Sequence, residues 1–331
     1  MNKLTKIGVS ALCGSLASVA AANAGALDVT GGATATYTSL DGVVTGNPLG
    51  MATGMTFTGN GELDNGATFK LSIAHTNKAA YTGSAISITT PTLGTFTYDE
   101  GGGTGLDRID DMMPTAWEET DGTGLPVGLR TVAGAGGSAD VEWTVGMALP
   151  DGMNVYGSYA PRPGGGNKNT NKGVGGDSGV VDGYGWDLVV THSGLYDGLN
   201  VFAGLSEIGQ VSTLSDREQK VWGATFAIGG ATLGYQESKD ENPGAASDYY
   251  ENTAYGVSFS VNDNLSISYG YHESEHNDND ATNVTLDAQS LQLAYTVGGA
   301  SIKVAESDVD NQNYVSGTNR EGRTIALTLA F

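Results

Sequence analysis

Apolar and polar residues alternate along most of the chain from residue 26 onward. The final segment is the clearest case, because Ile325, Leu327, Leu329 and Phe331 are separated by single alanine and threonine residues. A period of two gives one apolar and one polar face, which predicts a β-strand. The same alternation recurs in residues 69–73, 141–149, 255–261, 265–271 and 291–297.

The segments between these predicted strands alternate between two kinds. Short connections rich in Gly, Asn and Asp, typical of hairpin turns, occur at residues 64–66, 91–94, 150–152, 196–198, 229–230, 262–264 and 298–299. Longer polar connections occur at residues 41–50, 77–82, 100–139, 161–183, 209–217, 240–252, 276–283 and 309–321. Seven short turns and eight long loops predict sixteen strands.

An even number of strands, with long loops at one end and both termini at the other, is typical of bacterial transmembrane barrels. A mean hydropathy of −0.17 excludes a helical membrane protein, but not a barrel, in which only alternate residues face lipid. We therefore predict an all-β fold, a sixteen-stranded antiparallel transmembrane β-barrel. We find no linker, so residues 25–331 are expected to form a single domain.

The first 24 residues have the pattern of a secretory signal peptide. Lys3 and Lys6 precede an apolar stretch at residues 7–22, and small residues stand at the end of the segment, at Ala22 and Ala24. Serine and glycine residues interrupt the stretch, which argues against a retained membrane anchor. The only cysteine, Cys13, lies in this segment, so the mature chain is expected to lack disulfides and cysteine-based metal sites.

Charge narrows the range of partners. Without the two leader lysines, 13 Lys and Arg residues face 37 Asp and Glu residues, which gives a formal charge of −24. Such a surface disfavours nucleic acid and other anionic partners. Catalysis is also disfavoured, because the four histidines are scattered and no nucleophile or phosphate-binding motif is present. We predict that the protein is not an enzyme.

Four features carry a resemblance to a known family. They are the leader, the hairpin at residues 55–71, the long loop that follows residues 95–98, and the final strand ending on Phe331. Together they resemble Gram-negative general (diffusion) porins, especially the Rhodobacter-type porin family. The resemblance implies the outer membrane of a Gram-negative bacterium, reached through the periplasm, a homotrimer, a water-filled channel and a long third loop folded into the lumen.

The terminal phenylalanine also resembles the signal that the outer-membrane assembly machinery recognises. One departure from the family pattern is evident. Such porins often place a cluster of arginines opposite the third loop, and the first strands of this sequence carry no comparable cluster.

The predicted third loop is the most acidic long segment. Residues 99–142 contain ten acidic side chains and only two basic ones, Arg108 and Arg130. If the loop lies in the lumen, its carboxylates give a negative constriction, which attracts cations and repels anions. An external loop with solvated charges is the alternative. The candidate constriction residues are Asp107, Asp110, Asp111, Glu118, Glu119 and Asp121.

Opposing positive charge must come from inward-facing strand positions. The alternation nominates Lys70 and Lys303, each a few residues from a short turn. Two lysines against up to ten acids leave the aperture negative, so we predict a preference for cations.

Passive diffusion requires no cofactor, but the acidic loop raises the question of calcium. Oxygen ligands at Asp107, Asp110 and Asp111 suit Ca²⁺ rather than Zn²⁺. Solvated loop charge is the alternative, because no glycine and glutamate pattern of an EF-hand is present.

The leading hypothesis is passive diffusion of ions and small hydrophilic solutes through a pore in contact with outer-membrane lipids. A secreted soluble adhesin or lectin-like β-protein would share the leader and the acidity, and a substrate-specific porin is a third hypothesis. Tyr156 and Phe202 are the predicted lumen-facing aromatics. For trimer contacts, the flat outward face of Gly31, Ala33 and Ala35 is the candidate surface.

Overall fold

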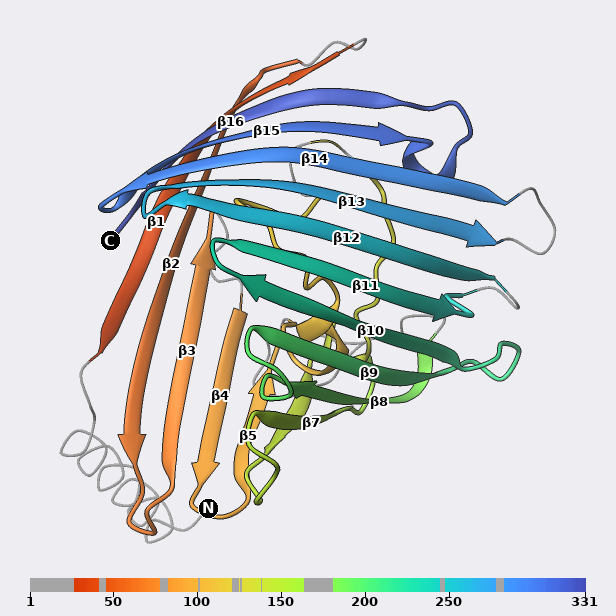
Figure 1. Ribbon diagram of the computed structural model, residues 1–331. Helices are drawn as coiled ribbons and strands as arrows, with labels where there is room; N and C mark the ends of the chain where they lie inside the picture. The colour runs from red at the N-terminus through yellow and green to blue at the C-terminus, as the bar shows by residue number, and fades with distance from the viewer. Residues whose placement is uncertain are drawn as a thin grey trace, which may run out of the picture.

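The computed structural model describes residues 27–41, 46–77, 83–100, 102–120, 125, 127–137, 139–163, 181–244, 248–277 and 283–331. The predicted leader and Asp121 lie outside these residues. Sixteen antiparallel strands form one closed barrel (Figure 1). This architecture confirms the predicted fold class. No helix among the described residues is long and apolar enough to cross a membrane.

The strands are β1 (Asp28–Leu40), β2 (Leu49–Glu62), β3 (Thr68–Thr76), β4 (Gly83–Thr90), β5 (Gly94–Asp99), β6 (Asp140–Val145), β7 (Met153–Ala160), β8 (Val181–His192), β9 (Leu199–Gln210), β10 (Arg217–Ile228), β11 (Ala231–Glu241), β12 (Tyr249–Asn262), β13 (Leu265–Asn277), β14 (Val284–Val297), β15 (Ala300–Asp310) and β16 (Arg320–Ala330). Among the described residues, three short 3-10 helices lie in the loops: η1 (Gly105–Ile109), η2 (Ala135–Gly137) and η3 (Gln312–Tyr314).

The barrel closes through its first and last strands. β1 pairs with β16 so that Thr34 lies opposite Thr328, and their hydroxyl groups are 3.0 Å apart. The backbone amide of Phe331 donates to the carbonyl of Gly31 at 3.0 Å, which extends the pairing to the last residue. Closure leaves no unpaired sheet edge, which a transmembrane sheet requires.

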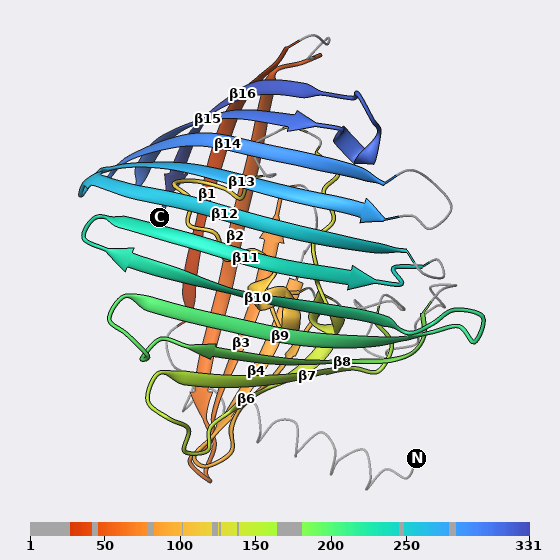
Figure 2. The same ribbon diagram turned by 45° about the vertical axis from the view of Figure 1, so that its right-hand side comes forward.

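Short turns gather at one end of the barrel and long loops at the other, as the sequence predicts. Figure 2 shows the turns between β8 and β9, β10 and β11, and β12 and β13 at the left, at the same end as the C-terminus. In the two-residue turns, Gly229 and Gly298 both have φ of 58°, a conformation that glycine adopts without a steric penalty.

Several strands extend further toward the loops than predicted. β11 continues to Glu241 and β12 begins at Tyr249, although residues 240–252 were expected to form a loop. These strand ends are rich in polar residues and so lack the apolar alternation. The backbone ladder does not need that alternation, because beyond the bilayer the side chains of both faces can be polar.

The outward face of the barrel is apolar and exposed. Trp222 is 51% exposed, Leu291 57% and Leu327 46%. Outward aromatic rings also stack across strands, as Tyr255 does on Tyr271 at a centroid distance of 4.9 Å. A continuous band of exposed apolar side chains on the outside of a closed barrel is the surface that a lipid bilayer covers.

The interior differs between its two sides. Inward positions of β1 to β5 carry mainly serine, threonine and small residues, with hydroxyl pairs such as Ser87 and Thr97 at 2.9 Å. Inward positions of β6 to β14 face the β5–β6 loop, residues 100–139, here named L3. L3 lies inside the ring of strands in both views (Figures 1 and 2). The predicted inward placement of this loop is therefore confirmed.

Candidate functional site

L3 is fixed to the wall first by an apolar cluster. Leu106 and Ile109 of η1 are fully buried, and they pack on Val189, Phe202 and Val221, which point inward from β8, β9 and β10. Val132 and Tyr156 complete the cluster. Val132 lies in the part of L3 that leads back to β6, here called the returning arm, and Tyr156 lies on β7. Phe202 points inward as predicted, but L3 covers it, so it is only 4% exposed and does not face the aperture.

A single carboxylate joins the two arms of L3. Asp187 of β8 accepts hydrogen bonds from the backbone amides of Leu106 at 2.9 Å, Ala135 at 2.8 Å and Gly136 at 2.8 Å. The side chain of Asp187 is 2% exposed. Charge-assisted bonds of this kind are about twice as strong as neutral ones. Asp187 therefore anchors the loop at both of its 3-10 helices.

Two of the ten acids between residues 99 and 142 lie on β6 and also anchor L3. Glu142 of β6 accepts the amide of Gly105 at 2.7 Å and pairs with Arg108, while Asp140 accepts the hydroxyl of Thr104 at 2.7 Å. Both carboxylates are almost completely buried. They hold the first arm of L3 in place, and Glu142 neutralises one of the two arginines of the loop.

Neutral side chains hold the tip of L3. Gln236 accepts the amide of Met112 at 3.1 Å, and Ser268 accepts the amide of Ala116 at 2.8 Å. Gln292 accepts the amides of Trp117 and Glu118, both at 3.0 Å. These residues point inward from β11, β13 and β14, and each satisfies backbone groups that would otherwise be buried without a partner.

Two glycines make room for the tip. A Cβ atom at Gly234 would overlap Pro114, and one at Gly256 would press on Pro114 and Met113. Met113 is 8% exposed. The tip of L3 therefore packs on the wall at Met113 and Pro114.

The returning arm of L3 is held by an ion-pair network. Asp240 of β11 is fully buried and receives two hydrogen bonds of 2.7 Å from Arg217 and one of 3.3 Å from Arg130. The guanidinium of Arg130 also donates to the carbonyl of Pro243 at 3.3 Å. The second arginine of L3 is thus paired as well.

The candidate acids lie on the part of L3 between these anchors. The carboxylate of Asp107 accepts the amide of Gly103 at 2.6 Å, that of Asp110 accepts Asp111 at 2.8 Å, and that of Asp111 accepts Met113 at 2.8 Å. Glu118 and Glu119 follow on the far side of the tip. Local bonds of this kind fix the directions of the carboxylates.

Burial raises the pKa of several of these acids. For Asp110, burial and then the charges of Asp107 and Glu119 raise the pKa to about 7, although the amide of Asp111 opposes the shift. Burial also raises the pKa of Asp107 and of Glu118. The charges of Asp107 and Glu119 act on Asp110, which indicates that L3 places each of them near Asp110.

This shift predicts a pH-dependent constriction. Asp110 holds its proton up to near-neutral pH, so its negative charge is present above a pH of about 7 and is lost as the pH falls through that value. Cation preference, measured as the reversal potential in a salt gradient, should fall by roughly twofold to fivefold in permeability ratio between about pH 8 and about pH 6. Asp110→Asn should flatten that change, and an equal change in the variant would contradict the assignment.

The two candidate lysines have different positions. Lys303 of β15 lies with its amino group 5.9 Å from the centre of the Trp117 ring, and its charge lowers the pKa of Glu118 against the effect of burial. Lys70 of β3 lines an inward hollow with Glu62 and Ser87, away from L3. Within the described residues, Lys70 forms no ion pair with an acid of L3.

The suggested calcium site is not formed. Among the described residues, no three His, Cys, Asp or Glu side chains lie close enough together to hold a metal ion. One carboxylate oxygen of each of Asp107, Asp110 and Asp111 instead accepts a hydrogen bond from a different backbone amide of L3.

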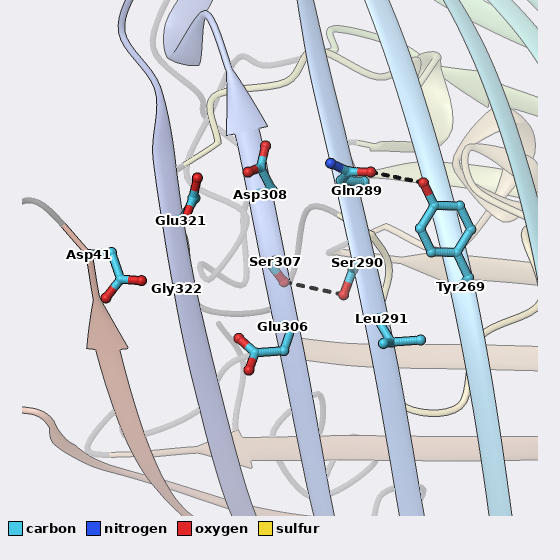
Figure 3. Close-up of a pocket in the computed structure, with 10 residues that line it drawn as sticks. All are labelled: Asp41, Tyr269, Gln289, Ser290, Leu291, Glu306, Ser307, Asp308, Glu321 and Gly322. Atoms are coloured by element: carbon cyan, nitrogen blue, oxygen red, sulfur yellow. Dashed lines mark hydrogen bonds between the residues drawn. The ribbon is translucent and has the colours of Figure 1, made fainter.

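Other acids lie on the outside of the barrel. A hollow of about 290 Å³ lies on the outside of β13 to β16. Glu306, Asp308 and Glu321 project there from the outward positions of their strands (Figure 3). Glu306 pairs there with Arg323. These carboxylates do not face the lumen and contribute to surface charge rather than to the constriction.

Comparison with known proteins identifies the family. The sequence profile described as Gram-negative porin matches residues 8–296. The chain belongs to the Gram-negative porin family. This porin is therefore a diffusion channel of the Gram-negative outer membrane rather than an enzyme. No curated protein matches its sequence.

Solved porins share the architecture at low sequence identity. OmpF of Salmonella typhi, in complex with daunomycin, has a TM-score of 0.68 at 13% identity over 92% of this chain and 97% of that chain. The trimer form of OmpT from Vibrio cholerae has a TM-score of 0.63 at 12% identity over 93% and 100%. An anion-selective porin from Comamonas acidovorans has a TM-score of 0.64 at 14% identity over 92% and 99%. These likenesses show the fold alone.

Sequence reasoning found the acidic part of L3 but missed its anchors. Asp187, Gln236 and Gln292 are single polar residues at inward positions of otherwise ordinary strands. The sequence signal for such an anchor is a polar residue between outward apolar neighbours, on a strand that faces the long loop. This signal does not specify which backbone amide of L3 each side chain binds.

Proposed function

We propose that this porin passes small cations and neutral hydrophilic solutes in preference to anions. The observation that carries the proposal is the pairing of both L3 arginines with buried wall carboxylates, Arg108 with Glu142 and Arg130 with Asp240. The basic residues of the loop are thereby neutralised where they stand. Among the described residues, Lys303 is the lysine that lies near these acids, where its charge lowers the pKa of Glu118 against the effect of burial.

The acids assigned to this constriction are Asp107, Asp110, Asp111, Glu118, Glu119 and Asp121, with Lys303 and, further away, Lys70 as the basic wall. The interior side formed by β1 to β5 supports the same proposal, because its serine and threonine hydroxyls can hydrogen-bond to a polar solute and carry no charge. The acidic loop and the hydroxyl-lined wall together favour neutral solutes and cations.

Liposome swelling tests this proposal directly. Proteoliposomes containing the purified porin are challenged with a neutral sugar, a cationic amino acid and an anionic amino acid of similar size. The swelling rate should fall in the order cationic, neutral, anionic. Equal rates for the two charged solutes, or a faster anionic one, would refute the preference while leaving the diffusion channel intact.

We also propose that the porin assembles as a homotrimer through the outward face of β1. Gly31, Ala33 and Ala35 leave this face flat, and Leu329 of β16 lies opposite Ala33 in the ladder. Small side chains allow two barrels to approach closely. OmpT of Vibrio cholerae, which shares the fold, has been solved as a trimer.

Ala33→Arg should shift the purified protein from the trimer to the monomer band in unheated gels, because a charge would be buried between barrels. Ala203→Arg is the matched control, since Ala203 is an exposed outward residue of β9 on another side of the barrel. A stable trimer in Ala33→Arg, or equal dissociation in both variants, would argue against this interface.

Two further proposals concern the leader and the subfamily. We propose that residues 1–24 are removed on export, so that N-terminal sequencing of the mature protein begins at Gly25. Within the porin family, a relationship to the Rhodobacter group is proposed on the hairpin at residues 55–71 and on the final strand.

A further inference from the structure

The loop between β15 and β16, residues 311–319, has an unusual backbone. Asn311, Asn313 and Tyr314 have φ values of 55°, 53° and 57°. Asparagine tolerates this left-handed region, whereas a residue as bulky as tyrosine is rarely found there. Such a conformation persists where the surroundings over-determine it, and it is concentrated at clamps and switches.

The surroundings of Tyr314 belong largely to L3. The hydroxyl of Tyr314 accepts the backbone amide of Arg130 at 3.0 Å and lies 2.7 Å from the hydroxyl of Ser274 on β13. One residue earlier, the amide of Asn313 donates to the carbonyl of Val127 at 3.1 Å. The β15–β16 loop therefore bonds the returning arm of L3 at two points.

The returning arm is shaped for this contact at Gly128. Gly128 has φ of 73°, and a Cβ atom there would overlap the side chain of Asn313. Only glycine allows both the backbone conformation and the close approach.

An aromatic cluster supports the same contact. The Tyr314 ring lies 5.1 Å from Tyr250 and 5.5 Å from His276, which themselves stack at 4.3 Å. The guanidinium of Arg130 lies 5.1 Å from the centre of the Tyr250 ring. Tyr314 also packs against a buried apolar cluster that includes Leu125, Val127 and Leu286. The contact joins β12, β13, L3 and the β15–β16 loop.

We infer that Tyr314 is a positioning residue for the channel constriction, through which a surface loop holds the returning arm of L3 in place. Long loops of bacterial barrels face outward from the cell, so the state of an external loop sets how firmly the internal loop is held. This contact affects how steadily the channel stays open and does not depend on its ion preference.

The test compares Tyr314→Phe and Tyr314→Ala with the parent in the complete purified porin. Tyr314→Phe keeps the ring and removes only the hydroxyl acceptor, so hydrogen exchange of the Arg130 amide should rise by roughly tenfold. Tyr314→Ala also removes the ring, and its single-channel current should show several-fold more frequent partial closures. The reversal potential should stay near that of the parent, because the candidate acids are held by other anchors.

Val315→Ala is the matched control, since Val315 is 54% exposed in the same loop and should leave exchange and current unchanged. Parent-like exchange at Arg130 in Tyr314→Phe, or parent-like current in a folded Tyr314→Ala barrel, would overturn the inference. Equal effects of Val315→Ala would also overturn it, because they would indicate a general loosening of the loop.

Discussion

Replacement of Asp187 by alanine is expected to loosen both arms of L3 at the barrel wall. The change leaves the buried amides of Leu106, Ala135 and Gly136 without their acceptor. Each buried amide left unpaired costs about 1–3 kcal/mol. We expect the loop to become more mobile near η1 and η2 while the other anchors and the barrel ladder persist, with larger current fluctuations and a lower thermal transition of the purified porin.

Asp187→Asn should have a smaller effect than Asp187→Ala, because its remaining carbonyl oxygen can accept some of the three bonds. Glu207→Ala is the control, since this acid lies on the outward side of the neighbouring strand β9. Single-channel recordings and heat-modifiability on gels provide the two readouts. A parent-like current and transition in Asp187→Ala would show that Asp187 does not position L3.

Neutralisation of the constriction acids is expected to abolish cation preference. The variant carries Asp107→Asn, Asp110→Asn, Glu118→Gln and Glu119→Gln, which keep similar shapes. One charge at about 4 Å from an ion in water contributes roughly 1 kcal/mol, or about a fivefold change in local concentration. The reversal potential in a salt gradient should therefore move to zero or to the anionic side.

The control for this variant uses acids of the outer hollow in Figure 3. Asp308→Asn with Glu321→Gln alters the overall charge in the same direction but on outward positions. Its reversal potential should match that of the parent. If the inner and outer variants shift the potential equally, selectivity reflects overall surface charge instead of the constriction.

The fold was largely predictable because the bilayer imposes a strong alternation. Every outward residue in the band must be apolar, so segments such as 291–297 and 325–331 display a clear period of two. Prediction was weaker beyond the bilayer. At Asp240 and Asn252 the strands continue with polar side chains, and nothing in the local pattern separates such a strand from a loop.

The site was predictable only in part. The acidity of L3 is a local property and can be counted from the sequence. Asp140 and Glu142 belong to the same acidic run, but inward parity on β6 places them beneath the first arm of L3, where they act as anchors. The partners of Asp187 and Tyr314 depend on how L3 crosses the lumen, which local periodicity does not encode.

The central claim is a water-filled channel whose constriction carries net negative charge, and the reversal potential of the unmodified porin tests it most directly. The purified protein is inserted into a neutral planar bilayer between two potassium chloride solutions of different concentration. Stepwise conductance with a potential of the sign set by potassium is the predicted result. A potential of the sign set by chloride, in channels that open in normal steps, would contradict it.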